Sequence, residues 1–432
     1  MGEQADMLLL PHFILNHSSY TSWELNHTYI SHEKEIFICT SVFSGFAVTF
    51  HTHHLFAGIS WSCQRSARRI CNDTDTSKPY HWHMGIAKTM KELILVMSLV
   101  SCGTDEILPI PQYDRLVCFY IVADNGLSLQ ADRFLSDITT YCKNGNVNNK
   151  EKLVIYINDK TGCYMYESST NGLMKVWNSH NVNSTDKNII RQVLASMSCK
   201  YPSKETGLIL WSHGLGWLPK GNDTRSFGDD QGFSVDIYEL AESFPLKYDY
   251  IIFDACFMGS LEVFAEMYEC CNYMVSSPCI VPAEGIIDTI SISSILQESD
   301  IRTRLTQVCK HYADVYSQKD TSVTLVNMGE FENVLNACKN ISVNTEIMHN
   351  KGLLKYEFRN NDVFYDFGSL AQEKSFLANF IIDAEKTGNY DSYCGISIYI
   401  PQDCNKDYIS PYTNTRWNRL TAWIEKFIHK DP

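Results

Sequence analysis

Short apolar segments alternate with segments of helical periodicity through most of this chain, and this alternation restricts the fold more than any other feature of the sequence. Residues 116–122, 152–157, 207–211 and 250–253 are rich in apolar side chains and predict strands that are buried on both faces. Strands that alternate with helices form a mostly parallel sheet with helices on both faces. The sequence therefore predicts one α/β domain over residues 113–432.

The same alternation predicts the remaining elements of this domain. We expect further strands at 273–277, 322–327 and 393–400, a hairpin-like element at 163–166, and helices at 127–141, 186–199, 237–244, 290–316, 331–341, 370–384 and 417–429. The C-terminal third is expected to add a subdomain to the sheet.

Residues 1–102 differ from the rest of the chain. Nine of the fourteen histidines lie within residues 1–89, but without the regular spacing of metal ligands. Residues 90–102 combine a short charged start, the apolar run 93–100 and a small residue before Cys102, which is the shape of a lipoprotein signal peptide. The alternative is an ordinary buried helix or strand.

A lipoprotein signal in this position leads to a hypothesis about the start of the protein. Translation would begin at Met90, residues 1–89 would be a non-native or disordered extension, and residues 103–112 would form a tether behind the lipidated Cys102. The acidic residues after Cys102 resemble the surface-export signals of some Bacteroidetes lipoproteins. We therefore expect an extracytoplasmic protein that is lipid-anchored in a bacterial cell envelope, either periplasmic or surface-exposed.

Charge and cysteine spacing argue against several classes of function. The formal net charge is −14, which does not fit the basic surface of a nucleic-acid-binding protein. The sixteen cysteines include no CxxC pair, so neither structural zinc nor thiol–disulfide exchange is expected. No cofactor is expected.

Two predicted strands end in residues that can perform nucleophilic catalysis. The strand at 207–211 leads into His213, and the strand at 250–253 leads into Cys256. If these strands are parallel neighbours, the imidazole and the thiol emerge at the same edge of the sheet. A thiolate attacks carbonyl carbon, and a histidine can protonate the leaving amine and activate water. Proximity to a helix N-terminus would also favour the thiolate.

The residues around this pair could supply an oxyanion hole. Gly214 and Gly216 place flexible backbone beside His213, and their N–H groups could act together with the N–H of Cys256. Taken singly, a cysteine or a histidine at a strand end is more often structural.

Two segments carry a resemblance to a known family. LWSHGLGW (residues 210–217) and FDACFMGS (residues 253–260) resemble the signature segments of the clostripain family of cysteine peptidases, and the similarity continues through residues 275–285. That family has the caspase-like fold of caspases, legumains, gingipains and separases. The resemblance implies a three-layer sandwich in which His213 is the catalytic histidine and Cys256 the nucleophile.

The resemblance also implies a substrate. The family prefers Arg or Lys before the scissile bond, so a carboxylate is expected in the specificity pocket. Glu284 is the first candidate, and Asp229 and Asp230 are the alternatives. Asp254 matches the family's acidic residue two before the cysteine, and it could orient the site, contact the substrate or simply cap a turn.

Other family properties are less well defined in this sequence. Many members have Gly-Gly after the histidine, whereas here Leu215 separates two glycines, and Cys279 is an unusual residue near the expected pocket. Relatives that cut themselves do so at a basic residue, for which Lys200, Lys204, Lys220 and Arg225 are candidates. Some relatives need calcium, and Asp223, Asp229 and Asp230 could supply oxygen ligands to this ion, although no EF-hand spacing occurs.

Two functions remain open from the sequence. The first is an endopeptidase, expected to be monomeric, that acts on peptide or protein substrates through a Cys–His dyad. The second is an inactive surface lipoprotein of the same fold that acts as a binding module.

Overall fold

The computed structural model divides the chain into two compact units, Met1–Pro109 and Ile110–Pro432. It describes residues 25–28, 38–43, 46–50, 111–180, 182–219, 226–341, 353–358, 362–370, 375–402 and 405–428. In the first unit, β1 (Leu25–Thr28), β2 (Ile38–Phe43) and β3 (Phe46–Phe50) form an antiparallel sheet. The expected signal peptide at 90–102, with Met90 and Cys102, lies outside the described residues.

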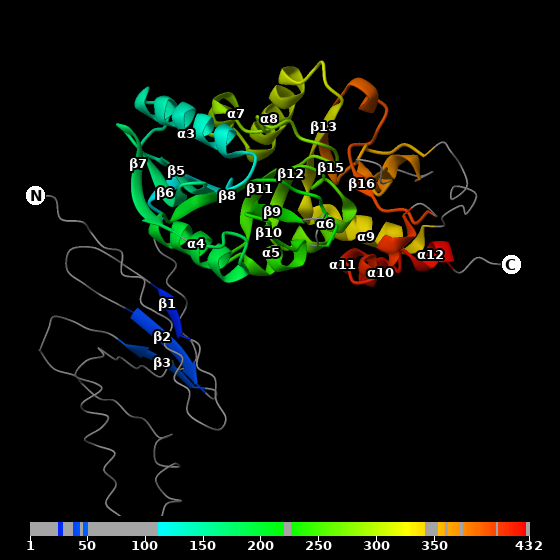
Figure 1. The fold of residues 1–432 in the computed structure, drawn as a ribbon, viewed down its shortest axis with the longest axis horizontal. Helices are drawn as coiled ribbons and strands as arrows, with labels where there is room; N and C mark the ends of the chain where they lie inside the picture. The colour runs from blue at the N-terminus through cyan, green and yellow to red at the C-terminus, as the bar shows by residue number, and fades with distance from the viewer. Residues whose placement is uncertain are drawn as a thin grey trace, which may run out of the picture. The chain divides into compact units, whose positions relative to one another are not determined.

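The second unit is built on a nine-stranded sheet with the order β15-β13-β12-β11-β8-β4-β5-β6-β7 (Figure 1). The five central strands run parallel, and two antiparallel strands lie at each edge. In chain order the strands are β4 (Tyr113–Val122), β5 (Glu151–Asp159), β6 (Gly162–Ser169), β7 (Gly172–Ser179), β8 (Ser203–Trp211), β11 (Tyr248–Asp254), β12 (Cys271–Ser276), β13 (Thr321–Asn327) and β15 (Ile381–Thr387). The predicted mostly parallel sheet is confirmed.

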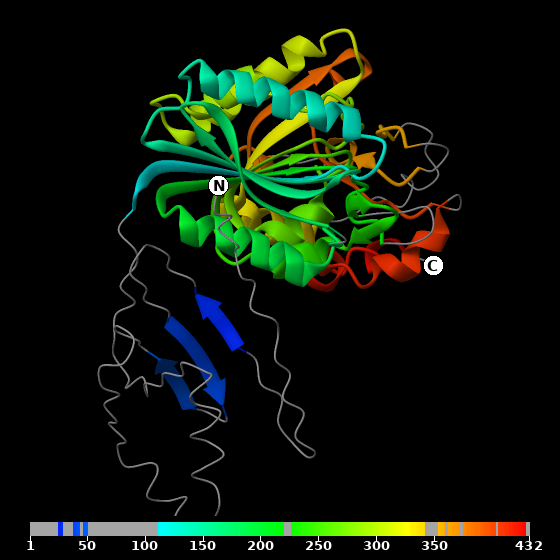
Figure 2. The same ribbon diagram turned by 60° about the vertical axis from the view of Figure 1, so that its left-hand side comes forward.

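Helices cover both faces of this sheet, which gives the expected three layers (Figure 2). On one face lie α3 (Ser128–Lys143), α7 (Thr289–Ile295) and α8 (Ile301–Val315). On the other face lie α4 (Lys187–Lys200), α5 (Ile237–Ser243), α6 (Leu261–Met267) and α9 (Phe331–Asn340). The central strands are buried on both sides, as their apolar sequences require.

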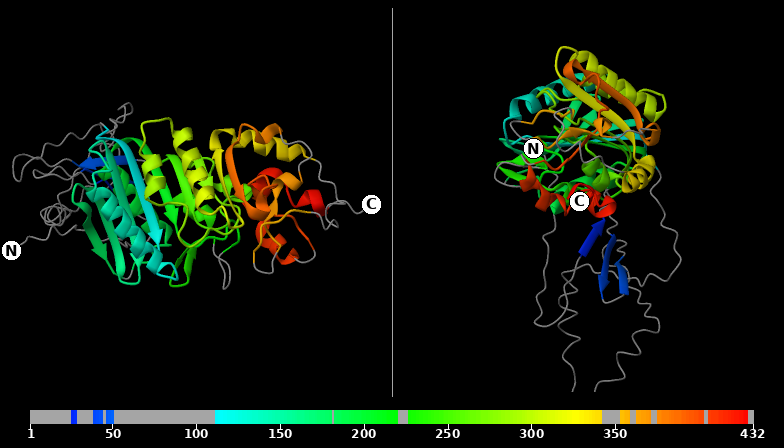
Figure 3. Two further views of the ribbon diagram at one scale, coloured as in Figure 1. Left: turned by 90° about the horizontal axis from the view of Figure 1, so that it is seen from above. Right: turned by 90° about the vertical axis from the view of Figure 1, so that its right-hand side faces the viewer.

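The C-terminal elements extend the fold at one end of the sheet (Figure 3). They comprise β14 (Tyr365–Asp366), β16 (Ser397–Ile398), α10 (Ile409–Tyr412), α11 (Arg416–Thr421) and α12 (Glu425–Ile428), and their apolar side chains belong to the core of the α6 face. Glu262 on α6 accepts hydrogen bonds from the Tyr399 backbone N–H and the Tyr412 hydroxyl, each at 2.8 Å. This buried carboxylate fastens the C-terminal elements to the helix that follows Cys256.

Three predicted elements near the C-terminus are wrong. The helix expected at 370–384 is instead a short 3-10 turn, Ser375–Leu377, followed by β15, because residues 381–387 pair with β13 at the sheet edge. Only Ser397–Ile398 of the expected strand 393–400 lies in a ladder. The expected helix 417–429 breaks at Ala422, whose φ of +50° ends α11 and lets both Trp417 and Trp423 be buried.

Candidate active site

The register of the sheet determines where His213 and Cys256 lie. β8 and β11 are parallel neighbours, and Trp211 pairs with Asp254 at the carboxyl end of both strands. His213 and Cys256 each follow this pair by two residues, and the Ser212 N–H continues the ladder by donating to the Asp254 carbonyl at 3.4 Å. The sequence did not show whether these two strands are parallel neighbours, and the structure shows that they are. Both residues lie at the edge of an open α/β sheet where ligands bind.

The loops that carry these two residues are in close contact. A Cβ atom on Gly214 would lie 2.8 Å from the Cys256 carbonyl oxygen and 3.0 Å from the Ala255 Cβ. Real Cβ atoms do not approach other atoms so closely without a shift of the backbone. Only glycine therefore fits beside the cysteine loop at this position.

A small hairpin holds the histidine loop from its other side. β9 (Phe227–Asp230) and β10 (Phe233–Val235) pair with each other. The Gly228 N–H donates to the His213 carbonyl at 3.0 Å, and the Leu215 N–H donates to the Ser226 carbonyl at 3.0 Å. The backbone around His213 is therefore fixed by hydrogen bonds and not only by packing.

Cys256 is partly buried and lies against the segment after β12. The Val281 N–H donates to its Sγ at 3.3 Å, and the thiol can donate to the Val281 carbonyl at 3.7 Å. Burial raises the pKa of the Cys256 thiol, and the Val281 N–H opposes this rise only in part. α6 begins only at Leu261, so Cys256 does not belong to the first turn of that helix.

The backbone directly after Cys256 adopts an unusual conformation. Phe257 has a φ of +59°, which is rare for a bulky side chain, and its ring stacks on Phe364 with centroids 4.5 Å apart. The chain turns sharply here between β11 and α6. Strained backbone of this kind is concentrated at functional sites.

Asp254 lies beneath the site rather than on its surface. Only 2% of the residue is exposed. Its Oδ1 accepts from the Ile286 N–H at 2.8 Å and its Oδ2 from the Ile287 N–H at 3.0 Å. Burial raises the pKa of this carboxyl group to about 7, and the charge of Asp288 adds to the effect.

The three candidate specificity acids have different environments. Glu284 is exposed on the segment that also contacts the thiol. Asp229 and Asp230 are buried, and they accept hydrogen bonds from the backbone N–H groups of Gly232 and Ser184. Burial also raises the pKa of Asp230. Of the three, Glu284 is the carboxylate that solvent, and hence a substrate, can reach.

The other candidates from the sequence take varied positions. Cys279 is buried with its pKa raised to about 11 by burial, and its carbonyl accepts from the Phe257 N–H at 3.0 Å. Lys200 and Lys204 carry ion pairs with Glu167 and Asp114. Asp223, Lys220 and Arg225 lie outside the described residues. No pattern in the sequence marked Val281, because its contact with the thiol is made by a backbone N–H.

Two searches of the described part of the chain gave negative results. No group of three or more His, Cys, Asp or Glu side chains there is arranged to hold a metal ion. No described helix combines the length and the apolar character needed to cross a membrane.

Comparison with known proteins agrees with this architecture. Among solved structures, an inactive zymogen C11 protease from Parabacteroides distasonis has a TM-score of 0.62 at 21% identity, covering 72% of this chain and 99% of that chain. A secreted C11 cysteine protease from Bacteroides thetaiotaomicron, in complex with an irreversible peptide inhibitor, has the same TM-score, identity and coverage. No curated protein matches the chain.

A family-level match covers the site itself. The profile of the clostripain family matches residues 119–366, which is more than half of the chain and includes both His213 and Cys256. The predicted fold class and the predicted family are both confirmed. This chain therefore belongs to the clostripain family of peptidases.

Proposed function

We propose that this protein is a cysteine endopeptidase in which Cys256 is the nucleophile and His213 the general acid and base. The proposal rests on the register of β8 and β11. His213 and Cys256 each follow the same paired position of these two strands by two residues, so both lie at the same edge of the sheet. Membership of the clostripain family supports it. The substrate is a peptide or a protein.

The reaction begins with attack of the Cys256 Sγ on the scissile carbonyl carbon. Burial raises the pKa of this thiol, which favours the thiol over the thiolate before the substrate binds. His213 takes the proton as the S–C bond forms, and then gives it to the leaving amine as the C–N bond breaks. His213 next activates a water that hydrolyses the thioester, which returns the thiol. The N–H groups of Gly214 and Cys256 stabilise the oxyanion.

We infer a preference for Arg or Lys before the scissile bond, with Glu284 as the carboxylate that binds the basic side chain. Its exposure on the segment that contacts the thiol supports this choice over Asp229 and Asp230, whose carboxylates are buried against backbone N–H groups. The reaction requires no cofactor. We also propose that the enzyme is monomeric and reaches the cell envelope through lipidation of Cys102.

The test uses fluorogenic peptides with Arg or Lys before the reporter group. Cys256→Ala and His213→Ala should each lower kcat by a factor of about a thousand or more. Cys199→Ala, at an exposed cysteine of α4, is the matched control and should leave turnover unchanged. Activity that survives Cys256→Ala would end the dyad assignment. Absence of turnover over a broad peptide library, with the Cys256 thiol still reactive, would instead favour the binding module.

A further inference from the structure

The C-terminal elements reach the loop of His213 through a cluster of aromatic rings. Trp217 follows His213 by four residues and is almost fully buried. Its ring packs against those of Tyr399 and Tyr412, with centroids 5.1 Å and 4.8 Å apart. The Tyr399 N–H and the Tyr412 hydroxyl both donate to the Glu262 carboxylate on α6, which fixes the two tyrosines in place. The C-terminal part of the chain therefore holds the far end of the histidine loop.

The same elements reach the loop of Cys256 through a second cluster. Phe257, the residue after Cys256, stacks on Phe364 with ring centroids 4.5 Å apart and an angle of 15° between the planes. The ring of Phe358 meets both of these rings edge to face, at 5.2 Å and 5.7 Å. Phe257 has a φ of +59°, which a bulky residue rarely adopts. The rings therefore hold the backbone after Cys256 in a conformation that its own sequence does not favour.

Phe364 lies between the two loops. Gly216 follows His213 by three residues. A Cβ atom on this glycine would lie 3.4 Å from the Phe364 Cε1 and 2.5 Å from the Phe257 carbonyl oxygen. The loops therefore meet at Gly216, and the buried ring of Phe364 lies against this meeting point as well as against the ring of Phe257. One side chain of the C-terminal elements thus packs on the loop of each reactive residue.

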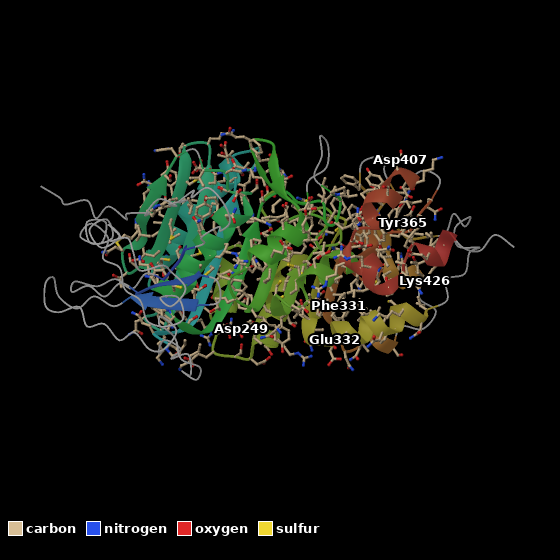
Figure 4. The ribbon with its side chains drawn as sticks, turned by 90° about the horizontal axis from the view of Figure 1, so that it is seen from below. Asp249, Phe331, Glu332, Tyr365, Asp407 and Lys426 are labelled. Atoms are coloured by element: carbon tan, nitrogen blue, oxygen red, sulfur yellow. The ribbon has the colours of Figure 1, made fainter. Side chains whose placement is uncertain are left out.

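Backbone hydrogen bonds also connect Phe364 to the cysteine loop. Phe364 directly precedes β14, in which Tyr365 pairs with Ile398 of β16, and Tyr365 lies among the C-terminal elements (Figure 4). β16 is joined in turn to the cysteine loop, because the Ser397 N–H donates to the Gly259 carbonyl at 2.9 Å. The position of the Phe364 ring relative to this loop is therefore fixed by the backbone as well as by stacking.

We propose that Phe364 is a positioning residue that holds the loops of His213 and Cys256 at the separation that the reaction requires. The proposal rests on the proposed function, in which these two residues form the catalytic dyad. The register of β8 and β11 brings both loops to one edge of the sheet, but each residue lies two positions beyond the last strand pair. Their alignment therefore depends on loop contacts, and the Phe364 ring supplies one to each loop.

The test is a double-mutant cycle on the alkylation of Cys256 by iodoacetamide in the full chain, measured by mass spectrometry of the peptide that contains this residue. His213→Ala should slow the alkylation by about tenfold or more, because the imidazole no longer accepts the thiol proton. In a Phe364→Ala background the same change should have little further effect, since the two loops are no longer held together. Equal effects of His213→Ala in both backgrounds, including no effect in either, would overturn the proposal.

Peptide hydrolysis gives a second measurement. Phe364→Ala should lower kcat by up to about a hundredfold, the loss that a misplacement of about 1 Å produces. KM should change little, because the Phe364 side chain is fully buried. Phe364→Leu keeps most of the apolar volume but not the flat stacking on Phe257, so it should show the same pattern even if Phe364→Ala does not fold. A raised KM with an unchanged kcat would contradict the positioning role.

Phe427→Ala is the matched control for loss of stability. This side chain is also buried in the C-terminal elements, where its ring packs on Trp423 with centroids 5.5 Å apart, and no aromatic contact in the described part of the chain joins it to either loop. Phe427→Ala should therefore lower the urea midpoint as Phe364→Ala does, but keep the kcat and the His213→Ala effect of the wild type. Loss of that effect in Phe427→Ala as well would overturn the proposal.

The outcomes also separate the positioning role from the proposed function. Loss of the His213→Ala effect in Phe364→Ala, in a chain that hydrolyses no peptide, would support the positioning role and contradict only the peptidase assignment. Hydrolysis that requires Cys256 but is unchanged in Phe364→Ala would keep the peptidase assignment and overturn the positioning role.

Discussion

Replacing Asp254 by asparagine is expected to change how the stability of the protein depends on pH. Burial raises the pKa of this carboxyl group from its ordinary value of 3.8 to about 7. Between these values the folded chain keeps a proton that the unfolded chain has released, so the free energy of unfolding of the wild type falls as the pH rises. Each pKa unit corresponds to about 1.4 kcal/mol, which gives a total of about 4 kcal/mol.

Asp254→Asn does not titrate at this position, so its stability relative to the wild type should rise by about 4 kcal/mol between about pH 4 and pH 8. Urea denaturation followed by tryptophan fluorescence, in small pH steps, measures this difference. Asp300→Asn is the control with the opposite sign, because hydrogen bonds from Thr303 lower the pKa of that exposed carboxyl group. Parallel pH profiles for Asp254→Asn and the wild type would refute the reasoning.

Three further predictions concern the site. Glu284→Gln should raise KM for peptides with Arg or Lys by about tenfold with little change in kcat, since an exposed carboxylate contributes mainly to binding; unchanged steady-state kinetics would exclude it. Gly214→Ala should destabilise the fold by about 1–3 kcal/mol in urea denaturation and lower kcat, because its Cβ meets the Cys256 carbonyl; wild-type stability would argue against the close approach. Alkylation of Cys256 in the wild type should have a pH midpoint above that of an ordinary cysteine; a midpoint below pH 7 would indicate a preformed thiolate–imidazolium pair.

Local sequence patterns predicted the centre of this fold well. The apolar runs that became β4, β5, β8 and β11 are buried on both faces, so their composition identifies them without any knowledge of their neighbours. Because His213 and Cys256 each follow such a strand, the same pattern predicted that each lies at a strand end, whereas the parallel pairing of β8 and β11 is known only from the structure.

The wrong predictions share a physical cause. Residues 381–387 have helical spacing together with the residues before them, but pairing with β13 determines their conformation. That pairing joins segments about 60 residues apart. Hydrophobic periodicity depends only on local sequence, so it cannot predict such a pairing. At Ala422, a left-handed backbone conformation interrupts a segment whose apolar spacing predicts one continuous helix.

The detailed environment of the site was equally beyond the sequence. Asp254 could have been a turn cap, an orienting residue or a substrate ligand, and only the path of residues 281–287 identifies its partners. The contact with the thiol comes from the backbone of Val281, so no side-chain pattern could mark it. Side-chain chemistry identified the candidate reacting groups, His213 and Cys256, and only the tertiary structure shows which backbone groups surround them.

The pairing of β8 between β4 and β11 also has a consequence for folding. β8 pairs with β4, about 90 residues earlier in the chain, and with β11, about 40 residues later. Such distant pairings form slowly, because loops must close before the contacts stabilise them. During synthesis, His213 leaves the ribosome before Cys256, and the Val281 segment that contacts the thiol follows later still. The nascent chain therefore carries both residues before the sheet brings them together, so under the proposed function activity can begin only once the sheet is complete.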